Sequence, residues 1–168
     1  MPKRAEIYVV SLVFFIIGCK KEEIDRGYVI ADTFPLGIWE SENVYYNITT
    51  DGTISINLFN DKSITSFREG IYIRNMPLLF DTISLKNEYE ENFDGDIHTT
   101  SHLVISSDNG IIGGYYTMSK DSWLVLNQIE PKTIHGEFQI QFKLDVGNEN
   151  FPDTIKLFNG IFTANLNN

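Results

Sequence analysis

Residues 134–144 read IHGEFQIQFKL, and this stretch decides the fold class of the chain. Apolar and polar side chains alternate along it, and a period of two is that of a β-strand with one buried and one solvated face. We expect Ile134, Phe138, Ile140, Phe142 and Leu144 on the buried face, opposite His135, Glu137, Gln139, Gln141 and Lys143. Burial of one face only is typical of an antiparallel sheet.

Similar patterns lie on both sides of this stretch. Residues 44–49 and 53–58 flank Asp51-Gly52, a dipeptide that favours a tight hairpin turn. Further strands are predicted at 71–74, 78–86, 97–105, 111–118, 123–129, 154–158 and 161–165, with turns such as 107–110 and Asn159-Gly160 between them. Short strands at this spacing predict an all-β fold, namely an antiparallel β-sandwich with a lipocalin-like β-barrel as the alternative.

The N-terminal segment has a different pattern. Lys3 and Arg4 precede an apolar run over residues 7–18. That run is about a dozen residues long, against the ~20 that a helix needs to cross a bilayer. A basic start, an apolar run of this length and a small residue at its end indicate a secretory signal peptide. The alternative is an uncleaved anchor or a buried N-terminal helix.

Cys19 is the only cysteine of the chain and directly follows this run. A lone cysteine in a secreted protein is a thiol without a partner. The stretch Ile16-Ile17-Gly18-Cys19 resembles the lipobox of bacterial lipoproteins at Gly18 and Cys19, and departs from it at the bulky Ile16 and Ile17. The resemblance implies cleavage before Cys19 and acylation of Cys19. Several acyl chains on one residue anchor a protein to a membrane without a spanning helix.

The expected organisation follows from this resemblance. Residues 1–18 are the lipoprotein signal peptide, 19–33 the lipidated cysteine and a charged tether, and 34–168 a single antiparallel β-domain. Lys21-Glu22-Glu23 resembles the surface-export signal of Bacteroidota-type lipoproteins, with a solvated linker as the alternative. Together these features imply a lipid anchor in the outer membrane, with the domain on the periplasmic face or the cell surface.

The mature chain is strongly acidic. Without Lys3, Arg4 and Glu6, the 13 basic and 23 acidic residues become 11 and 22, which gives a formal charge of −11. An acidic surface repels phosphate backbones, so we expect no nucleic-acid partner, and anionic lipid headgroups are poor partners too.

Two resemblances concern the β-domain. The segment from Gly114 to Phe162, with Gly136-Glu137-Phe138 and Asn159-Gly160-Ile161-Phe162, resembles a domain of unknown function common in small Bacteroidota lipoproteins. It implies a long hairpin near the C-terminus and no transferable activity. Gly37-Ile38-Trp39, with Asp51-Gly52-Thr53 behind it, is similar to the start of a lipocalin-like barrel.

The candidate metal ligands are few. His98 and His102 have the spacing of a helical zinc pair, but the residues around them are β-branched and predict a strand. Four residues along a strand span about 13 Å, which is too far for one ion. Asp94 and Asp96 in the acidic stretch 88–96 are the weak calcium candidates, although their spacing misses the EF-hand pattern. We prefer the alternative interpretation of residues 88–96, a solvated hairpin loop, and we therefore expect no metal and no cofactor.

Two adjacent tyrosine pairs, Tyr45-Tyr46 and Tyr115-Tyr116, lie on predicted strands, so one ring of each pair must face outward. Outward tyrosines are candidates for binding a glycan or a protein, and the alternative is that they pair across strands of an exposed sheet. Asp81-Thr82-Ile83 and Asp153-Thr154-Ile155 resemble O-glycosylation sites of extracytoplasmic proteins in the same bacterial group.

The sequence contains no recognisable catalytic arrangement. His135 stands on the polar face of its strand with no evident acid or nucleophile beside it in the sequence. We therefore expect a membrane-anchored, non-enzymatic β-domain that binds a glycan, a protein or a small ligand at the cell envelope. The alternative is an envelope hydrolase, because the two carboxylates of a glycosidase need not leave a motif.

Overall fold

The structure is a computed structural model that describes residues 27–34, 37–60, 68–87, 98–147 and 149–167. Within these ranges the chain forms strands and no helix, which confirms the all-β prediction. Accordingly, this part of the chain contains no helix with the length and hydropathy of a membrane span. The strands are β1 (Tyr28–Phe34), β2 (Gly37–Ser41), β3 (Asn43–Ile48), β4 (Ile54–Asn60), β5 (Arg68–Met76), β6 (Thr82–Ser84), β7 (Thr100–Ser107), β8 (Gly110–Thr117), β9 (Trp123–Ile129), β10 (Thr133–Val146) and β11 (Thr154–Leu166).

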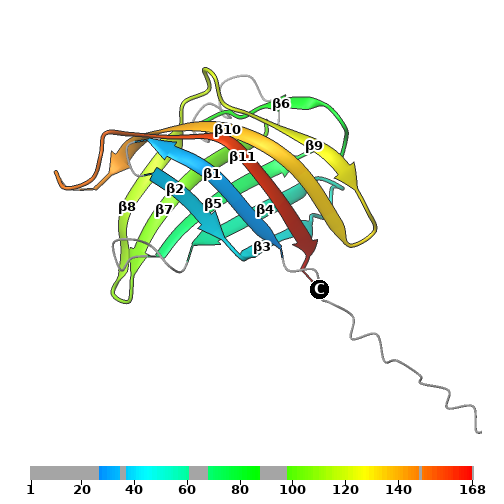
Figure 1. Ribbon diagram of the computed structural model, residues 1–168, viewed down its shortest axis with the longest axis horizontal. Helices are drawn as coiled ribbons and strands as arrows, with labels where there is room; N and C mark the ends of the chain where they lie inside the picture. The colour runs from blue at the N-terminus through cyan, green and yellow to red at the C-terminus, as the bar shows by residue number, and fades with distance from the viewer. Residues whose placement is uncertain (1–26, 35–36, 61–67, 88–97, 148, 168) are drawn as a thin grey trace, which may run out of the picture.

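All of these strands belong to one sheet with the order β2-β1-β11-β3-β4-β5-β7-β8-β10-β9-β6. A further pairing joins β10 to β11, so the strands from β11 through β3 and β8 to β10 form a closed ring. Neighbouring strands pair in antiparallel orientation except for β11 and β3, which are parallel. Figure 1 shows β1, β10 and β11 crossing over β4, β5 and β7, so the sheet covers its core from two sides. The two layers resemble those of a β-sandwich, and the closed ring of paired strands resembles a β-barrel.

The predicted faces of residues 134–144 are confirmed. Ile134, Phe138, Ile140 and Phe142 are fully buried, and Leu144 is partly buried against the same core. Their polar neighbours are half-buried or exposed. β10 serves both layers, because its first half pairs with β9, its last residues pair with β8, and β11 follows most of its length.

Two Gly-x-Phe triplets interlock between β10 and β11. In the antiparallel register Gly136 lies opposite Phe162, and Phe138 lies opposite Gly160. A Cβ atom at Gly136 would lie 2.6 Å from the Phe162 ring, and one at Gly160 would lie 2.6 Å from the Phe138 ring. Each ring therefore fills the space that a side chain on the opposite strand would occupy. Packing gives a physical reason for the paired triplets of the sequence.

The predicted hairpin at Asp51-Gly52 joins β3 to β4. Thr49 N donates a 2.8 Å hydrogen bond to Thr53 O, and Gly52 has the positive φ of 85° that glycine adopts readily. The Asp51 carboxylate accepts hydrogen bonds from the Thr49 hydroxyl and, at 3.1 Å, from Thr53 N. These bonds lower the pKa of Asp51, and the bond from the Thr49 hydroxyl has the largest effect.

The folded domain begins earlier than the sequence predicts. Residues 28–33, expected in the tether, form most of β1 and pair with both β2 and β11. Val29, Ala31 and Thr33 point inward and are buried. The outward residues Tyr28, Ile30 and Phe34 are apolar as well, so apolar and polar side chains do not alternate clearly in the sequence. The segment becomes a strand because partners are available on both sides.

Two other segments also differ from expectation. The turn predicted at Asn159-Gly160 is wrong, because β11 continues through it with a bulge at Asn159, whose φ is 52°. Of residues 78–86, only Thr82–Ser84 form a strand. The preceding residues 77–80 form a bend with three exposed apolar side chains, which an apolar run alone does not distinguish from a buried strand.

Candidate functional site

The four tyrosines proposed as ligand contacts divide between the two faces of the sheet, as alternation predicts. Tyr46 and Tyr115 are buried in the core, whereas Tyr45 and Tyr116 are half-buried on the outer face. Burial raises the pKa of Tyr46. The structure therefore leaves only Tyr45 and Tyr116 as candidates for contact with a ligand on the outer surface.

Tyr45 belongs to an aromatic stripe on the outer face, formed with Phe59, Tyr72 and His102. Successive ring centroids along the stripe are 5.7, 5.4 and 5.0 Å apart. Tyr72 and His102 stack at 16°, and Phe59 meets Tyr72 edge-on at 84°. Tyr116 lies opposite His102 in the β7–β8 register. Because these rings cover one another, the stripe fits cross-strand stabilisation better than a row of open ring faces.

A surface cleft of about 380 Å³ lies on the outer side of β10 and β11. Its volume falls in the range of roughly 300–1,000 Å³ that is typical of ligand pockets. The residues that line it are Asp121, Gln139, Ile140, Gln141, Lys156, Leu157, Phe158 and Asn159. Two of them, Asp121 and Asn159, have positive φ angles of 67° and 52°. Uncommon backbone conformations of this kind concentrate at binding sites.

The cleft forms where β10 changes neighbours. Gln139 is the last residue of β10 that pairs with β9, and Phe142 is the first that pairs with β8. On the other side β11 bulges at Asn159, where it has one residue more than β10. A β-bulge bends its strand and redirects the neighbouring side chains. The strand pairing of β10 is thus interrupted along both of its edges, close to residues 139–141.

Three side-chain amides line the cleft, and each amide nitrogen is already bound within the fold. Their acceptors are Asp121 O for Gln139 (3.0 Å), Met118 Sδ for Gln141 (3.2 Å) and Asp32 Oδ2 for Asn159 (3.0 Å). The three side-chain carbonyl oxygens accept no hydrogen bond from the described part of the chain. Each oxygen has two lone pairs. The residues that line the cleft therefore keep three side-chain acceptors available for a ligand.

The rest of the lining adds one ring and two charges. The Phe158 side chain is 37% exposed, and Lys156 and Asp121 are exposed as well. An apolar wall with a few polar groups is the usual composition of a small-molecule site. This cleft suits a ligand that donates several hydrogen bonds and has one apolar face.

Sequence patterns did not point to these residues. The period of two places Gln139 and Gln141 on the solvated face of the strand, and Asn159-Gly160 predicts a turn. The usable signal was Gly160 within an otherwise strand-like run, because an isolated glycine in a strand pattern suggests a bulge.

A second polar group lies inside the sheet. Glu69 on β5 accepts a 2.7 Å hydrogen bond from Trp39 Nε1 on β2. Burial raises the pKa of Glu69, and the bond from Trp39 opposes that shift. The Tyr115 hydroxyl donates to Pro152 O at 3.0 Å. Burial, followed by the negative charges of Glu69 and Asp153, raises the pKa of Tyr115 to about 12. This group joins β2 to β5, and it lies away from the cleft lining.

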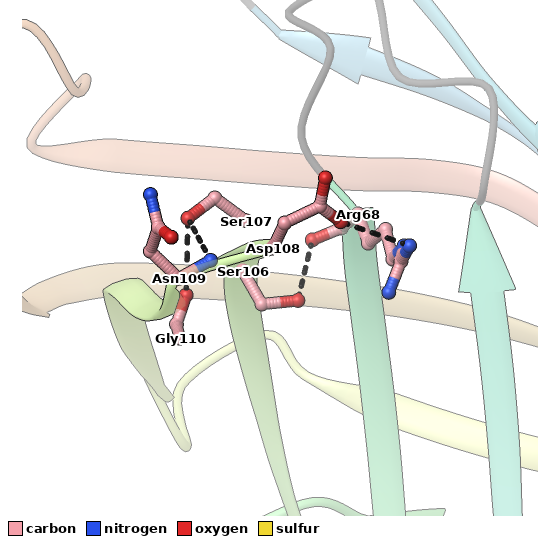
Figure 2. A network of polar contacts seen from close by, with 6 residues as sticks. All are labelled: Arg68, Ser106, Ser107, Asp108, Asn109 and Gly110. Atoms are coloured by element: carbon pink, nitrogen blue, oxygen red, sulfur yellow. Dashed lines mark hydrogen bonds and ion pairs between the residues drawn. The ribbon is translucent and has the colours of Figure 1, made fainter.

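An exposed network of polar contacts joins the start of β5 to the β7–β8 turn, as Figure 2 shows. Arg68, at the start of β5, forms a 3.1 Å ion pair with Asp108 in the β7–β8 turn, and Ser106 Oγ donates to Arg68 O at 3.5 Å. Within the turn, Ser107 Oγ accepts a 3.2 Å hydrogen bond from Asn109 N. Both charged side chains are largely exposed, and ion pairs of this kind contribute little to stability. The network positions the turn.

The histidines considered as zinc ligands have different surroundings. His98 Nε2 lies 3.1 Å from Lys86 Nζ, His102 belongs to the aromatic stripe, and His135 Nδ1 lies 2.8 Å from Thr163 Oγ1. Across the described residues there is no group of three or more His, Cys, Asp or Glu side chains that could hold a metal ion.

Several predicted residues stay untested. Cys19, Asp94 and Asp96 lie outside the described residues. The two threonines of the predicted glycosylation motifs lie inside them. Thr82 is exposed at the start of β6, and Thr154 is half-buried at the start of β11.

Comparison of the chain with models of protein families, with curated proteins and with solved structures finds no match in any of the three.

Proposed function

We propose that this chain is a membrane-anchored cell-envelope lipoprotein whose β-domain binds a glycan, without cleaving it, in the cleft on the outer side of β10 and β11. The observation that carries the proposal is the arrangement of Gln139, Gln141 and Asn159. Their side-chain nitrogens are bound within the fold, which leaves their carbonyl oxygens as acceptors, and the exposed Phe158 lines the same cleft.

A glycan matches this arrangement chemically. Sugar hydroxyls donate hydrogen bonds, and the C–H face of a pyranose ring is apolar enough to lie on Phe158. Lys156 adds a donor for a ring or hydroxyl oxygen, and Asp121 adds a charged acceptor, which forms stronger hydrogen bonds than a neutral one. The net charge of −11 expected for the mature chain favours a neutral glycan over an acidic one.

The composition of the cleft favours binding over hydrolysis. Glycosidases use two carboxyl groups about 5–9.5 Å apart. Among the described residues that line the cleft, Asp121 supplies the only carboxylate. A binding site needs no second one.

The anchoring part of the proposal rests on the N-terminal sequence. The basic start, the short apolar run and Gly18-Cys19 support cleavage and acylation at Cys19, and the acyl chains would hold the domain at the outer membrane.

The binding part is tested with the full-length chain in detergent, titrated with a panel of neutral oligosaccharides. Phe158→Ala removes the ring and Gln139→Ala removes one acceptor. Each should weaken binding about tenfold, since one good contact is worth roughly 1–1.5 kcal/mol. The matched controls are Phe80→Ala, an exposed ring outside the cleft, and Gln128→Ala, an exposed amide on β9.

Both controls should bind like the wild type. Melting temperatures of all four variants establish that the fold is intact. The absence of binding to every oligosaccharide, or equal losses in cleft and control variants, would contradict a glycan site in this cleft.

A further inference from the structure

The bend at residues 77–80 exposes three consecutive large apolar side chains. Leu78 is 41% exposed, Leu79 is 42% exposed and Phe80 is 67% exposed. A 3.1 Å hydrogen bond from Leu79 N to Pro77 O holds the backbone of the bend. Single exposed apolar residues are normal on a protein surface, but adjoining ones mark an interaction site.

A fourth exposed apolar residue lies at the same end of the sheet. The bend directly follows Met76, which pairs with Ile54 of β4, and Ile54 pairs with Ile48 at the end of β3. Ile48 is 56% exposed. The register therefore places Ile48 and the bend at one end of three neighbouring strands.

The N-terminal tether enters the fold close to this end. Gly27 packs directly on the backbone oxygens of Val44 and Thr163. Val44 and Ile48 are four residues apart on β3, a separation of about 13 Å. Cys19 precedes Gly27 by eight residues in the sequence, so the intervening chain reaches at most about 28 Å. An anchor at Cys19 would keep this end of the domain near the membrane surface.

We propose that the bend at residues 77–80 docks into the surface of the lipid bilayer that holds the acyl chains of Cys19. This inference rests on the anchoring part of the proposed function. The anchor raises the local concentration of the bend at the bilayer, so that a small apolar contact suffices to orient the domain. The acidic mature chain suits zwitterionic lipids.

The outer face of β1, β2 and β11 is the competing surface, because Phe34, Ile38 and Ile161 are also exposed there. Asp32 and Glu40 stand among them, in register with Ile38 and Ile30 respectively. Entry of this face into a bilayer would remove two carboxylates from water, which is costly. Residues 77–80 carry no charge, and the exposed Asp81 that follows them lies at the edge of the bend, whereas Asp32 and Glu40 lie within the competing face.

The test uses the acylated full-length chain in vesicles of phosphatidylcholine and phosphatidylethanolamine. An acylated Cys19 has no free thiol, so an introduced cysteine is the single reactive one. Phe80→Cys places an environment-sensitive dye on the bend, and Phe34→Cys places it on the competing face. The two positions are matched, because both phenylalanines are 67% exposed. Nitroxide-labelled lipids then report contact with the bilayer.

Docking predicts a blue shift and strong quenching of the dye at position 80 and neither effect at position 34. Absence of quenching at position 80, or equal quenching at both positions, overturns the docking proposal while the anchor stands. The wild-type chain is treated with the same dye. Labelling of wild-type Cys19 would show that the thiol is free, which overturns the anchor and the docking proposal that rests on it.

Discussion

At the scale of single residues, Glu69 shows how burial changes the behaviour of a charge. Its carboxylate lies between β2 and β5, and the described hydrogen bond to its side chain comes from Trp39 Nε1. Burial disfavours the charged form and raises the pKa of Glu69 above its usual value of 4.5. A group whose pKa is raised by folding contributes stability below its unfolded pKa and loses that contribution as the pH rises through the folded pKa.

Glu69→Gln should therefore raise the melting temperature at pH 7, because the amide oxygen still accepts from Trp39 without a buried charge. The gain should shrink at pH 4, because this pH lies below the raised pKa of Glu69 and the wild-type carboxyl is then largely protonated. Thermal unfolding at the two pH values measures both effects, with the exposed Glu40→Gln as a control that should change neither. A variant that is less stable than the wild type by the same amount at both pH values would contradict this account.

At the scale of elements, β10 and β11 depend on each other through their Gly-x-Phe triplets. The Phe138 and Phe162 rings lie 6.2 Å apart, each over a glycine of the opposite strand. This contact joins the two strands at the place where they close the sheet. Close-packed interiors leave little space for an additional carbon atom.

Gly136→Ala should destabilise the fold by about 1–3 kcal/mol, the usual cost of overpacking a core. Its Cβ would lie 2.4 Å from Val125 O and 2.6 Å from the Phe162 ring. Gly114→Ala is the matched control, because a Cβ at this strand glycine meets nothing within 4 Å. It should stay within about 0.5 kcal/mol of the wild type.

Urea unfolding of both variants measures the difference. Equal free energies of unfolding for Gly136→Ala and Gly114→Ala would mean that the two rings do not pack as described.

The elements differ in how far the sequence predicts them. The faces of β10 could be predicted because each side chain reports its own environment through a period of two. β1 could not, because most of its outward residues are apolar too, and the segment becomes a strand only between β2 and β11. The Asn159 bulge lies between two strand-like runs, where a turn and a bulge have the same local composition.

At the scale of the whole molecule, the cleft results from contacts between distant segments. The cleft requires that pairing of β10 with β9 ends at Gln139 and that pairing with β8 begins at Phe142. It also requires the bulge of β11 opposite Gln139. A local sequence pattern does not predict where a strand changes neighbours. The pattern therefore indicates only that Gln139 and Gln141 face solvent, and not that they line a cleft. The predicted outward tyrosines were correctly placed on strands, but the rings around Tyr45 cover one another.

The central claim is that a glycan binds in the cleft on the outer side of β10 and β11, and the most direct test is to locate the binding site on the full-length chain by NMR. Backbone amide shifts are followed while the protein is titrated with the tightest-binding neutral oligosaccharide of the panel. The account predicts that the largest shifts fall on residues 139–141 and 156–159. Largest shifts on the aromatic stripe of Tyr45, Phe59 and Tyr72, or no shifts along β10 and β11, would contradict it.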